Sequence, residues 1–323
     1  MLIVRRHSTN PYFNIAAEEY FLKTFQGDLF MLWQNEPCLV VGKHQNTLAE
    51  VNTDFVDQHQ IPVIRRISGG GTVYHDEGNL NFTFISTGER ERLVNFRRFV
   101  QPVADALAKL GLTATLGIRN DIRINDLKIS GNAEHVYKNR VLHHGTLLYD
   151  TNLENLEEAI KPGNASFTDK AVQSVRSRVT NIRDHLTVKM EMAEFRLFLE
   201  TQIAGNFDNP GYYVLNQHDI HEIEQLVQKK YKTWEWNFGY SPVYTFSKSI
   251  LTADGKVNLQ LEVRNGIIEN AAIRPEFAVS AEIRLLENSL TGLRHTPDIF
   301  RDLSQNPDFA EIFKELRLRS LHK

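Results

Sequence analysis

The most informative stretch of the sequence is Arg65-Arg66-Ile67-Ser68-Gly69-Gly70-Gly71-Thr72-Val73-Tyr74-His75-Asp76. Apolar residues lead into it and out of it, so we expect two strands joined by three glycines. Glycines weaken a strand, but they let a ligand approach bare backbone whose N–H groups can face an anion. The two arginines supply forked donors suited to carboxylate or phosphate. Two interpretations stay open here: an anion site, or a glycine-rich β-bulge beside solvated arginines.

The bulk composition is that of a globular protein. The chain has 323 residues, of which 41% are hydrophobic and 24% charged, with a formal net charge of −3. This charge argues against a dedicated nucleic-acid binder, and no apolar stretch is long enough for a membrane span. The single cysteine, Cys38, fits a reducing compartment. We therefore expect a cytoplasmic protein of two domains, without nucleic-acid or membrane partners.

Hydrophobic patterning predicts strands and helices interspersed along residues 1–242. Strands are expected at residues 29–33, 39–41, 79–86, 113–116, 121–124, 127–130 and 141–149. One helix is expected to begin after Asn14 as its cap, with Glu18 and Glu19 near the helix start. Further helices are expected at residues 96–110, 152–160, 190–203 and 219–230. The polar segment 163–175 lacks periodicity and is predicted to be a mobile loop.

The character of the sequence changes after Pro242. Three strand-like runs follow, separated by Asp254-Gly255 and Asn265-Gly266, which are strong hairpin signals. Helical segments are expected at 281–286, at 297–303 and near the C-terminus. Residues 243–323 are therefore predicted to form a small α+β domain.

A second suggestive stretch is Arg119-Asn120-Asp121-Ile122-Arg123-Ile124-Asn125-Asp126-Leu127-Lys128-Ile129-Ser130-Gly131-Asn132-Ala133. Its alternation places Asp121 and Lys128 on one side of a hairpin that turns at Asn125-Asp126. A lysine beside Ser130-Gly131 can reach an anionic ligand, and the glycine lets that ligand lie close. The alternative is an ordinary solvated strand face.

Two further motifs carry polar groups. In His143-His144-Gly145-Thr146-Leu147-Leu148, neighbouring strand residues point to opposite faces, so the histidines would rarely bind one metal ion. We expect one inward histidine, hydrogen-bonded in the core. In residues 174–181, Arg176 and Arg178 flank a serine and suit either a phosphate or a solvated connection. Cys38 begins an apolar strand and is predicted to be buried rather than nucleophilic.

Taken in order, these motifs closely resemble those of the lipoate–protein ligase family. Residues 32–35 and 234–239 extend the resemblance, the latter matching the segment before that family's small C-terminal accessory domain. The resemblance spans essentially the whole chain. It implies an α+β (α/β) protein, with a large mixed-sheet catalytic domain of the biotin/lipoate ligase type and a C-terminal domain that swings during the cycle.

The resemblance also implies a two-step reaction. Lipoate's carboxylate would attack the α-phosphate of ATP, with Mg²⁺ as cofactor, giving lipoyl-AMP and pyrophosphate. A lysine of a lipoyl-domain acceptor would then attack this anhydride, leaving an amide and AMP. The implied acceptors are acyltransferase subunits of 2-oxoacid dehydrogenases and the glycine cleavage H protein, bound transiently by a monomer.

Roles for individual residues follow from their places in the matching motifs. Lys128 would stabilise charge on the carboxylate and α-phosphate, while Asp121 would hold Mg²⁺ or orient the incoming amine. Residues 163–181 would fold over the adenylate and exclude water. The implied lipoate-binding residues are Trp33, Arg66, Ser68, Gly69, Gly70, Gly71, His75 and His144, with Val73 also along the slot. The implied nucleotide-binding residues are Gly71, Val73, Tyr74, Asn120, Asp121, Lys128, Ala133, Gly145, Thr146 and Arg178.

Four alternatives compete with this interpretation. An amidotransferase that works through a cysteine thioester is disfavoured, because Cys38 does not resemble that family's nucleophile. A lipoyltransferase that uses preformed lipoyl-AMP keeps the same glycines and lysine, so the sequence does not separate it. A non-catalytic lipoate-binding protein would not need Lys128 or Asp121, and a biotin–protein ligase has a different glycine-rich motif. The preferred acceptor and the choice between lipoate and octanoate stay open.

Overall fold

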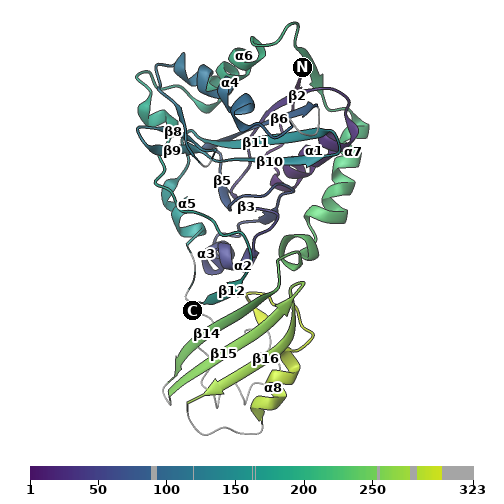
Figure 1. Ribbon diagram of the computed structural model, residues 1–323, viewed down its shortest axis with the longest axis vertical. Coiled ribbons are helices and arrows are strands. Elements are labelled where there is room, and N and C mark those ends of the chain that lie inside the picture. The colour runs from purple at the N-terminus through teal and green to yellow at the C-terminus, as the bar shows by residue number, and fades with distance from the viewer. Residues whose placement is uncertain are drawn as a thin grey trace. The chain divides into compact units, whose positions relative to one another are not determined.

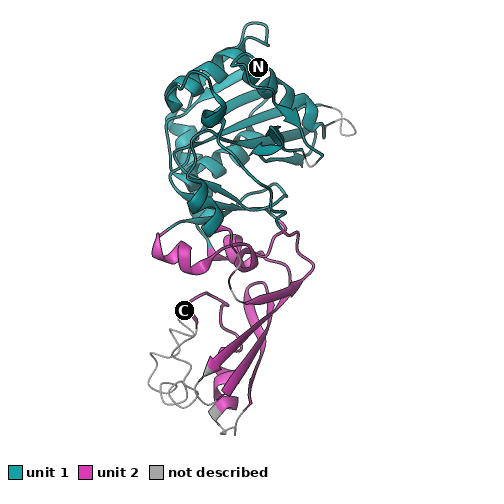
Figure 2. Ribbon diagram, turned by 90° about the vertical axis from the view of Figure 1, so that its left-hand side faces the viewer, with its two compact units in different colours: residues 1–43, 61–158, 174–233 teal, residues 44–60, 159–173, 234–323 magenta. Residues whose placement is uncertain are grey.

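The structure of the protein is a computed structural model that describes residues 1–88, 93–118, 120–161, 163, 165–252, 255–276 and 282–299. Arg119, Asp254, residues 300–303 of a predicted helix and the helix predicted near the C-terminus lie outside these residues. Two compact units make up the chain, and Figure 2 shows them in different colours. Unit 1 comprises Met1–Lys43, Ile61–Glu158 and Ser174–Thr233, and unit 2 comprises His44–Gln60, Ala159–Gln173 and Trp234–Lys323.

Unit 1 is built on a six-stranded mixed sheet (Figure 1). In order across the sheet its strands are β10 (Asn132–Tyr137), β11 (Arg140–Leu148), β6 (Asn79–Thr87), β2 (Leu29–Trp33), β1 (Leu2–Arg5) and β13 (Gly211–Val214). The strands β2, β1 and β13 run parallel, and the pairs on the β10 side are antiparallel. This arrangement confirms the expected mixed α/β class.

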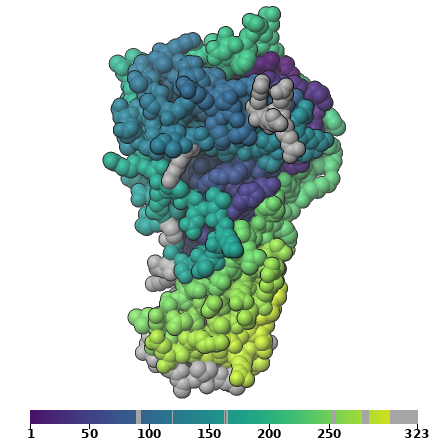
Figure 3. Space-filling model, in the orientation of Figure 1, coloured from purple at the N-terminus to yellow at the C-terminus, as the bar shows by residue number. Residues whose placement is uncertain are grey.

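The two faces of this sheet differ in chemistry. On one face Leu80, Phe82 and Phe84 join the main hydrophobic core, as the alternation in the sequence predicts, and pack with α4 (Phe96–Ala108) and α6 (Met192–Ala204). Residues around α4, in blue, form part of the outer surface of unit 1 (Figure 3). The opposite face carries buried side chains with polar groups, here called the polar face: Trp33, Asn79, Asn81, Thr83, His144 and Thr146. Buried polar groups are costly unless they are satisfied, so this face is a candidate site whose hydrogen bonds are described below.

Two three-stranded sheets complete the strands of unit 1. One contains β4 (Val63–Arg65), β3 (Cys38–Val41) and β5 (Val73–His75), with β3 in the centre. The other contains β7 (Thr115–Leu116), β8 (Ile122–Ile124) and β9 (Leu127–Ser130). Asn125 and Asp126 join β8 to β9 with φ of 49° and 62°, the left-handed values of a type I′ hairpin. The predicted hairpin is confirmed.

The first helix, α1 (Pro11–Thr24), begins earlier than predicted. Its cap is Asn10, whose side chain accepts a hydrogen bond from the Phe13 amide, and Pro11 takes the first helical position. The prediction that Asn14 caps the helix is wrong, because Asn14 is buried inside it. Glu18 therefore lies in the middle of the helix and is buried, far from the positive helix end.

The other helices of unit 1 are shorter or less regular. They are α5 (Leu153–Ala159), whose last residue falls in unit 2, α7 (Gln217–Leu226), a 3-10 helix at Ile182–His185 and a π-helical turn at Val227–Tyr231. No helix in the described ranges is long and apolar enough to cross a membrane.

Unit 2 is organised around a four-stranded sheet. Its strands are β12 (Ser166–Asp169), β14 (Tyr244–Thr252), β15 (Gly255–Arg264) and β16 (Ile267–Pro275), accompanied by α2 (Thr47–Glu50), α3 (Thr53–Gln58), a π-helical turn at Glu235–Gly239 and α8 (Glu282–Leu290). The three strands predicted after Pro242 are confirmed. Asn265 and Gly266 form the expected turn, with φ of 50° and 72°.

The prediction of a mobile loop over residues 163–175 is wrong in part. Residues Ser166–Asp169 form β12, which pairs antiparallel with β14 from Ser166–Ser247 to Asp169–Tyr244. The Phe167 ring packs against the rings of Tyr244 and Phe246. A short edge strand held by residues far along the chain leaves little local pattern, because its stability comes from its partner.

Candidate active site

Arg66 holds the two ends of the glycine segment together. Its Nη2 donates to the carbonyls of Gly69 and Gly71 at 2.6 and 2.8 Å. Its Nη1 donates to the Val40 carbonyl and its Nε to Ser68 Oγ, both at 2.9 Å. Burial lowers the pKa of Arg66 to about 10. Arg66 thus shapes the loop from within, and the alternative of solvated arginines is excluded.

The glycines themselves lie close to other parts of unit 1. Gly70 has φ of 90°, in the left-handed region that favours glycine, and a Cβ there would lie 3.9 Å from the Ala133 Cβ. A Cβ on Gly71 would lie 2.9 Å from Ser174 Oγ, and the Thr72 amide donates to that oxygen at 2.9 Å. The chain at Ser174 therefore crosses directly over the glycine segment.

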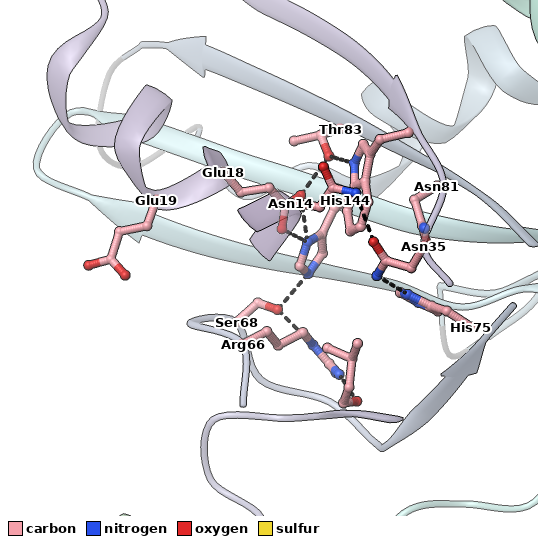
Figure 4. Close-up of polar contacts among 12 residues, drawn as sticks. Asn14, Glu18, Glu19, Asn35, Arg66, Ser68, His75, Asn81, Thr83 and His144 are labelled. Carbon is pink, nitrogen blue, oxygen red and sulfur yellow. Dashed lines mark hydrogen bonds and ion pairs between the residues drawn. The ribbon is translucent and has the colours of Figure 1, made fainter. Parts of the chain in front are cut away.

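A continuous line of hydrogen bonds, here called the relay, connects this loop to Trp33, and Figure 4 shows its part from Arg66 to Thr83. Ser68 Oγ lies 2.6 Å from His144 Nε2, and His144 Nδ1 lies 3.0 Å from both carboxylate oxygens of Glu18. Thr83 Oγ1 donates to Glu18 at 2.6 Å and accepts from Trp33 Nε1 at 2.9 Å. The members of the relay are all buried: Arg66, Ser68, His144, Glu18, Thr83 and Trp33.

The donors in the relay can be assigned from its ends. Glu18 as a carboxylate only accepts, so His144 carries a proton on Nδ1. Ser68 Oγ accepts from Arg66 Nε at 2.9 Å and lies 2.6 Å from His144 Nε2, so it connects the guanidinium to the imidazole. Such a network fixes the glycine segment relative to the polar face.

A second buried line of contacts leads to His75. Asn14 Nδ2 faces the carbonyls of Ser8 and Gln34 and the side-chain oxygen of Asn35, at 2.8 to 2.9 Å. Asn35 Nδ2 in turn lies 3.0 Å from His75 Nδ1. Burial, followed by the charges of Arg66 and His144, lowers the pKa of His75 to about 3. His75 is therefore neutral, and its ring meets that of Trp33 edge-on at 5.9 Å.

Lys128 lies on β9 against Gly131. A Cβ on Gly131 would lie 3.2 Å from Lys128 Nζ, so glycine gives the ammonium its room. The Gly131 amide donates to Thr146 Oγ1 at 3.1 Å, and the Thr146 amide donates to the Gly131 carbonyl at 3.0 Å. The Lys128 backbone is bonded to Arg178 and Thr180 on either side of Val179. The structure thus joins Lys128, Gly131, Thr146 and the 178–180 segment.

Asp121 has one paired and one unpaired oxygen. Oδ2 accepts from Arg123 Nε at 2.7 Å, whereas Oδ1 is buried and lacks a hydrogen-bond partner among the described residues. An unpaired carboxylate oxygen fits a single ligand of Mg²⁺, which often takes one or two carboxylates plus phosphates and water. The described ranges contain no group of three or more His, Cys, Asp or Glu residues placed to hold a metal. Nucleotide phosphates and water would have to complete such a site.

The remaining predicted nucleotide-site residues have separate environments. Asn120 has φ of 60° and its carbonyl accepts from Asn132 Nδ2 at 2.7 Å. A Cβ on Gly145 would lie 2.2 Å from Asn132 Oδ1 and 2.5 Å from the Phe82 ring, so close packing alone requires glycine there. Val73 is half-buried, Tyr74 is buried and Arg178 is exposed.

Sequence reasoning missed Glu18, Thr83, Asn35 and Asn14 as site residues. One pattern in the sequence does indicate a polar site: Asn79, Asn81 and Thr83 alternate with three apolar residues in a strand that is buried on both faces. The sequence predicts that one histidine of the pair points inward. In the structure both His143 and His144 are buried, on opposite faces of the sheet. His144 joins the relay, and His143 bonds Glu134 at 2.9 Å and stacks between Phe82 and Phe99.

Comparison with known proteins bears directly on this site. Residues 10–204 match the lipoyl protein ligase A/B catalytic domain, and residues 241–323 match the bacterial lipoate protein ligase C-terminus. The chain is also 39% identical over 316 residues to lipoate–protein ligase 1 of Staphylococcus aureus, covering 97% of this chain and 96% of that protein. The chain belongs to the lipoate–protein ligase family. The matched catalytic region contains the whole relay and the surroundings of Lys128.

Solved structures in the lipoate–protein ligase family share this fold. A crystal structure of lipoate–protein ligase A bound with ATP is 26% identical, with a TM-score of 0.64, covering 74% of this chain and 98% of that chain. A structure from Thermoplasma acidophilum, described as a bipartite lipoate protein ligase and its E2 lipoyl domain, is 26% identical with a TM-score of 0.64. It covers 74% of this chain and 96% of that chain. The chain therefore carries a ligase catalytic domain of the lipoate/biotin type.

Proposed function

We propose that the protein is an ATP-dependent lipoate–protein ligase acting in two steps. In the first, a lipoate carboxylate oxygen bonds to the α-phosphorus of ATP, the bond to the β-phosphate oxygen breaks, and pyrophosphate leaves. In the second, the amine of an acceptor lysine attacks the acyl carbon of lipoyl-AMP, loses its proton and expels AMP. Family membership supports the ligase class, and the ATP and E2 lipoyl domain in relatives support the nucleotide and the acceptor.

The observation that carries the proposal is the position of Lys128 beside the polar face. Lys128 Nζ lies against Gly131, which is bonded to Thr146. Thr146 and Trp33 both pair with Asn81, from opposite sides, in one row of the sheet. An acyl chain lying along this row would place its carboxylate at the ammonium and its far end at Trp33. The ammonium would then stabilise the charge that develops on the carboxylate and phosphate oxygens.

Other residues would serve the nucleotide and the intermediate. The backbone of residues 68–71 would offer N–H donors to phosphate oxygens. Asp121 would hold Mg²⁺ through its unpaired oxygen, and the ion would neutralise phosphate charge there. The segment from Ser174 to Asn181 crosses the glycines and borders Lys128, so it would keep water from a readily hydrolysed acyl-adenylate. We place these functions in a catalytic domain at 1–242, with an accessory domain at 243–323.

The thioester-forming amidotransferase fits the structure poorly. Cys38 is fully buried, and this burial raises the pKa of its thiol well above the ordinary value. A thiol held neutral and away from solvent is a poor nucleophile. The burial of Cys38 therefore argues against a mechanism in which its thiol carries the acyl group.

The first step is tested by the exchange of labelled pyrophosphate into ATP in the presence of lipoate. A complete ligase catalyses this exchange without any acceptor, because lipoyl-AMP formation is reversible on the enzyme. If exchange is absent while supplied lipoyl-AMP still modifies a lipoyl domain, the protein is a transferase. If both activities are absent, the proposal fails.

A further inference from the structure

The orientation of the Asn35 side chain is determined by its neighbours. Asn14 Nδ2 faces two backbone carbonyls, those of Ser8 and Gln34, so this atom must be the amide nitrogen. The Asn35 atom that faces Asn14 Nδ2 at 2.9 Å must then be the oxygen. Consequently Asn35 turns its NH₂ group toward His75. The two main-chain carbonyls thus determine the orientation of both asparagine side chains.

This orientation fixes the proton on His75. Nδ1 receives a hydrogen bond from Asn35, so it is the acceptor nitrogen of the ring. His75 is neutral, and its single ring proton must therefore lie on Nε2. His144 differs, because its Nδ1 faces the Glu18 carboxylate and therefore carries a proton. The two buried histidines can therefore donate hydrogen bonds from different ring nitrogens, His75 from Nε2 and His144 from Nδ1.

The Nε2–H group of His75 has no hydrogen-bond acceptor within the described part of the chain. His75 is 3% exposed, and its Nε2 is buried without a hydrogen-bond partner. Asn81 pairs with Trp33 between β2 and β6, and its Nδ2 is also buried without a hydrogen-bond partner among the described residues. Native proteins seldom leave buried donors unpaired, because each costs much of its desolvation energy. Two such donors near Trp33 indicate a ligand with acceptor atoms at that end of the polar face.

We infer that His75 is a specificity-determining residue whose Nε2–H donates to a ring sulfur of the acyl substrate. This inference rests on the proposed function, in which the substrate's far end lies at Trp33. Apart from the carboxylate, the two sulfurs are the substrate's only heteroatoms, and sulfur is a weak acceptor. Asn14 and Asn35 are positioning residues that present the proton. The enzyme should therefore prefer lipoate to an acid of equal shape without sulfur.

The test compares lipoate with its carbocyclic analogue, in which cyclopentane replaces the dithiolane ring. The two acids have similar shape and differ mainly in the acceptor atoms. For the full chain, kcat/KM for pyrophosphate exchange should favour lipoate by about tenfold, as expected when one analogue leaves a donor unpaired. In the His75→Leu variant this preference should fall to about one. An unchanged preference in His75→Leu overturns the inference.

His143→Leu is the matched control. It also removes a buried neutral histidine, but on the core face of the sheet, so the preference for lipoate should stay near the unsubstituted value. If His143→Leu abolishes the preference equally, the effect is general loosening of the sheet and the inference fails.

A second measurement needs no substituted protein. Nitrogen NMR of His75 should show the proton on Nε2, and this N–H signal should move with lipoate but not with the carbocycle. A proton on Nδ1, or equal shifts with both acids, overturns the inference. Because this experiment requires binding alone, it decides the inference even if pyrophosphate exchange, and with it the proposed function, fails.

Discussion

Glu18 and His144 lie 126 positions apart, yet His144 Nδ1 lies 3.0 Å from both carboxylate oxygens of Glu18. This contact connects helix α1 to strand β11, the neighbour of the edge strand β10, on the polar face. It orients the His144 ring, which in turn contacts Ser68 and, through Ser68, Arg66. The shape of the glycine segment thus depends on a helix residue that does not border it.

Replacing Glu18 should affect the glycine segment from a distance. Glu18→Leu leaves the Thr83 hydroxyl and His144 Nδ1 without an acceptor, so we expect a loss of about 1–3 kcal/mol of unfolding free energy and a KM for lipoate about tenfold higher. Glu18→Gln keeps an acceptor oxygen for both groups and should lie closer to the unsubstituted enzyme. Urea unfolding and initial rates measure the two effects. Equal behaviour of the leucine and glutamine variants would show that the carboxylate oxygens have no role.

Gly71 and Gly69 offer a matched pair of substitutions. A Cβ on Gly71 would lie 2.9 Å from Ser174 Oγ and 3.3 Å from its Cα, whereas nothing lies within 4 Å of a Cβ on Gly69. Gly71→Ala should therefore displace Ser174 from the Thr72 amide and speed hydrogen exchange of that amide about fivefold, the equivalent of one hydrogen bond of ~1 kcal/mol. Gly69→Ala should leave this exchange unchanged. Identical exchange in Gly71→Ala would mean that the crossing at Ser174 is not tight.

Acid should destabilise the fold through His75. Burial lowers its folded-state pKa to about 3 from an ordinary value of 6.5, so the unfolded chain binds a proton that the folded protein refuses. The stabilisation is complete above pH 6.5 and is lost as the pH falls toward 3. The slope contributed by this one proton is about 1.4 kcal/mol per pH unit. His75→Leu should flatten the pH dependence of unfolding free energy by this amount, and an unaltered slope would contradict the buried neutral ring.

Lys128 should be required for activation and dispensable for folding. Lys128→Ala removes the ammonium beside Gly131, and we expect pyrophosphate exchange to fall at least ~100-fold, in the range seen when one stabilising donor is lost. Unfolding free energy should change little, because the side chain is half-exposed. Lys138→Ala, at the exposed turn between β10 and β11, is the control and should retain full exchange. Exchange that survives in Lys128→Ala would remove this residue from the mechanism.

The sequence predicts those parts of the fold whose pattern is local. The alternation of Leu80, Phe82 and Phe84 identifies β6, and Asn125-Asp126 identifies a hairpin, because strand period and left-handed turn residues act over a few positions. The same holds for the glycine segment. Family resemblance adds Lys128 and Asp121 as candidates, whose roles stay predictions; the structure packs Lys128 against Gly131 and buries Asp121.

Other features depend on contacts between distant residues. The mixed-polarity strand β10 was missed because its stability comes from pairing with β11. From the sequence alone Glu18 is expected to be a charge near the helix start, because no residue near it in the sequence indicates its contact with His144. The orientations of His75 and His144 depend on carbonyls and side chains from separate segments. Such relationships emerge only when the chain is folded.

The central claim is that this chain both activates lipoate and transfers it. The most direct measurement incubates the protein with ATP, lipoate and an unmodified lipoyl domain, following pyrophosphate release and the acceptor's mass. We predict release that requires lipoate, and an acceptor mass raised by one lipoyl group. An acceptor that stays unmodified with ATP and lipoate, yet is modified when lipoyl-AMP is supplied, would contradict the claim.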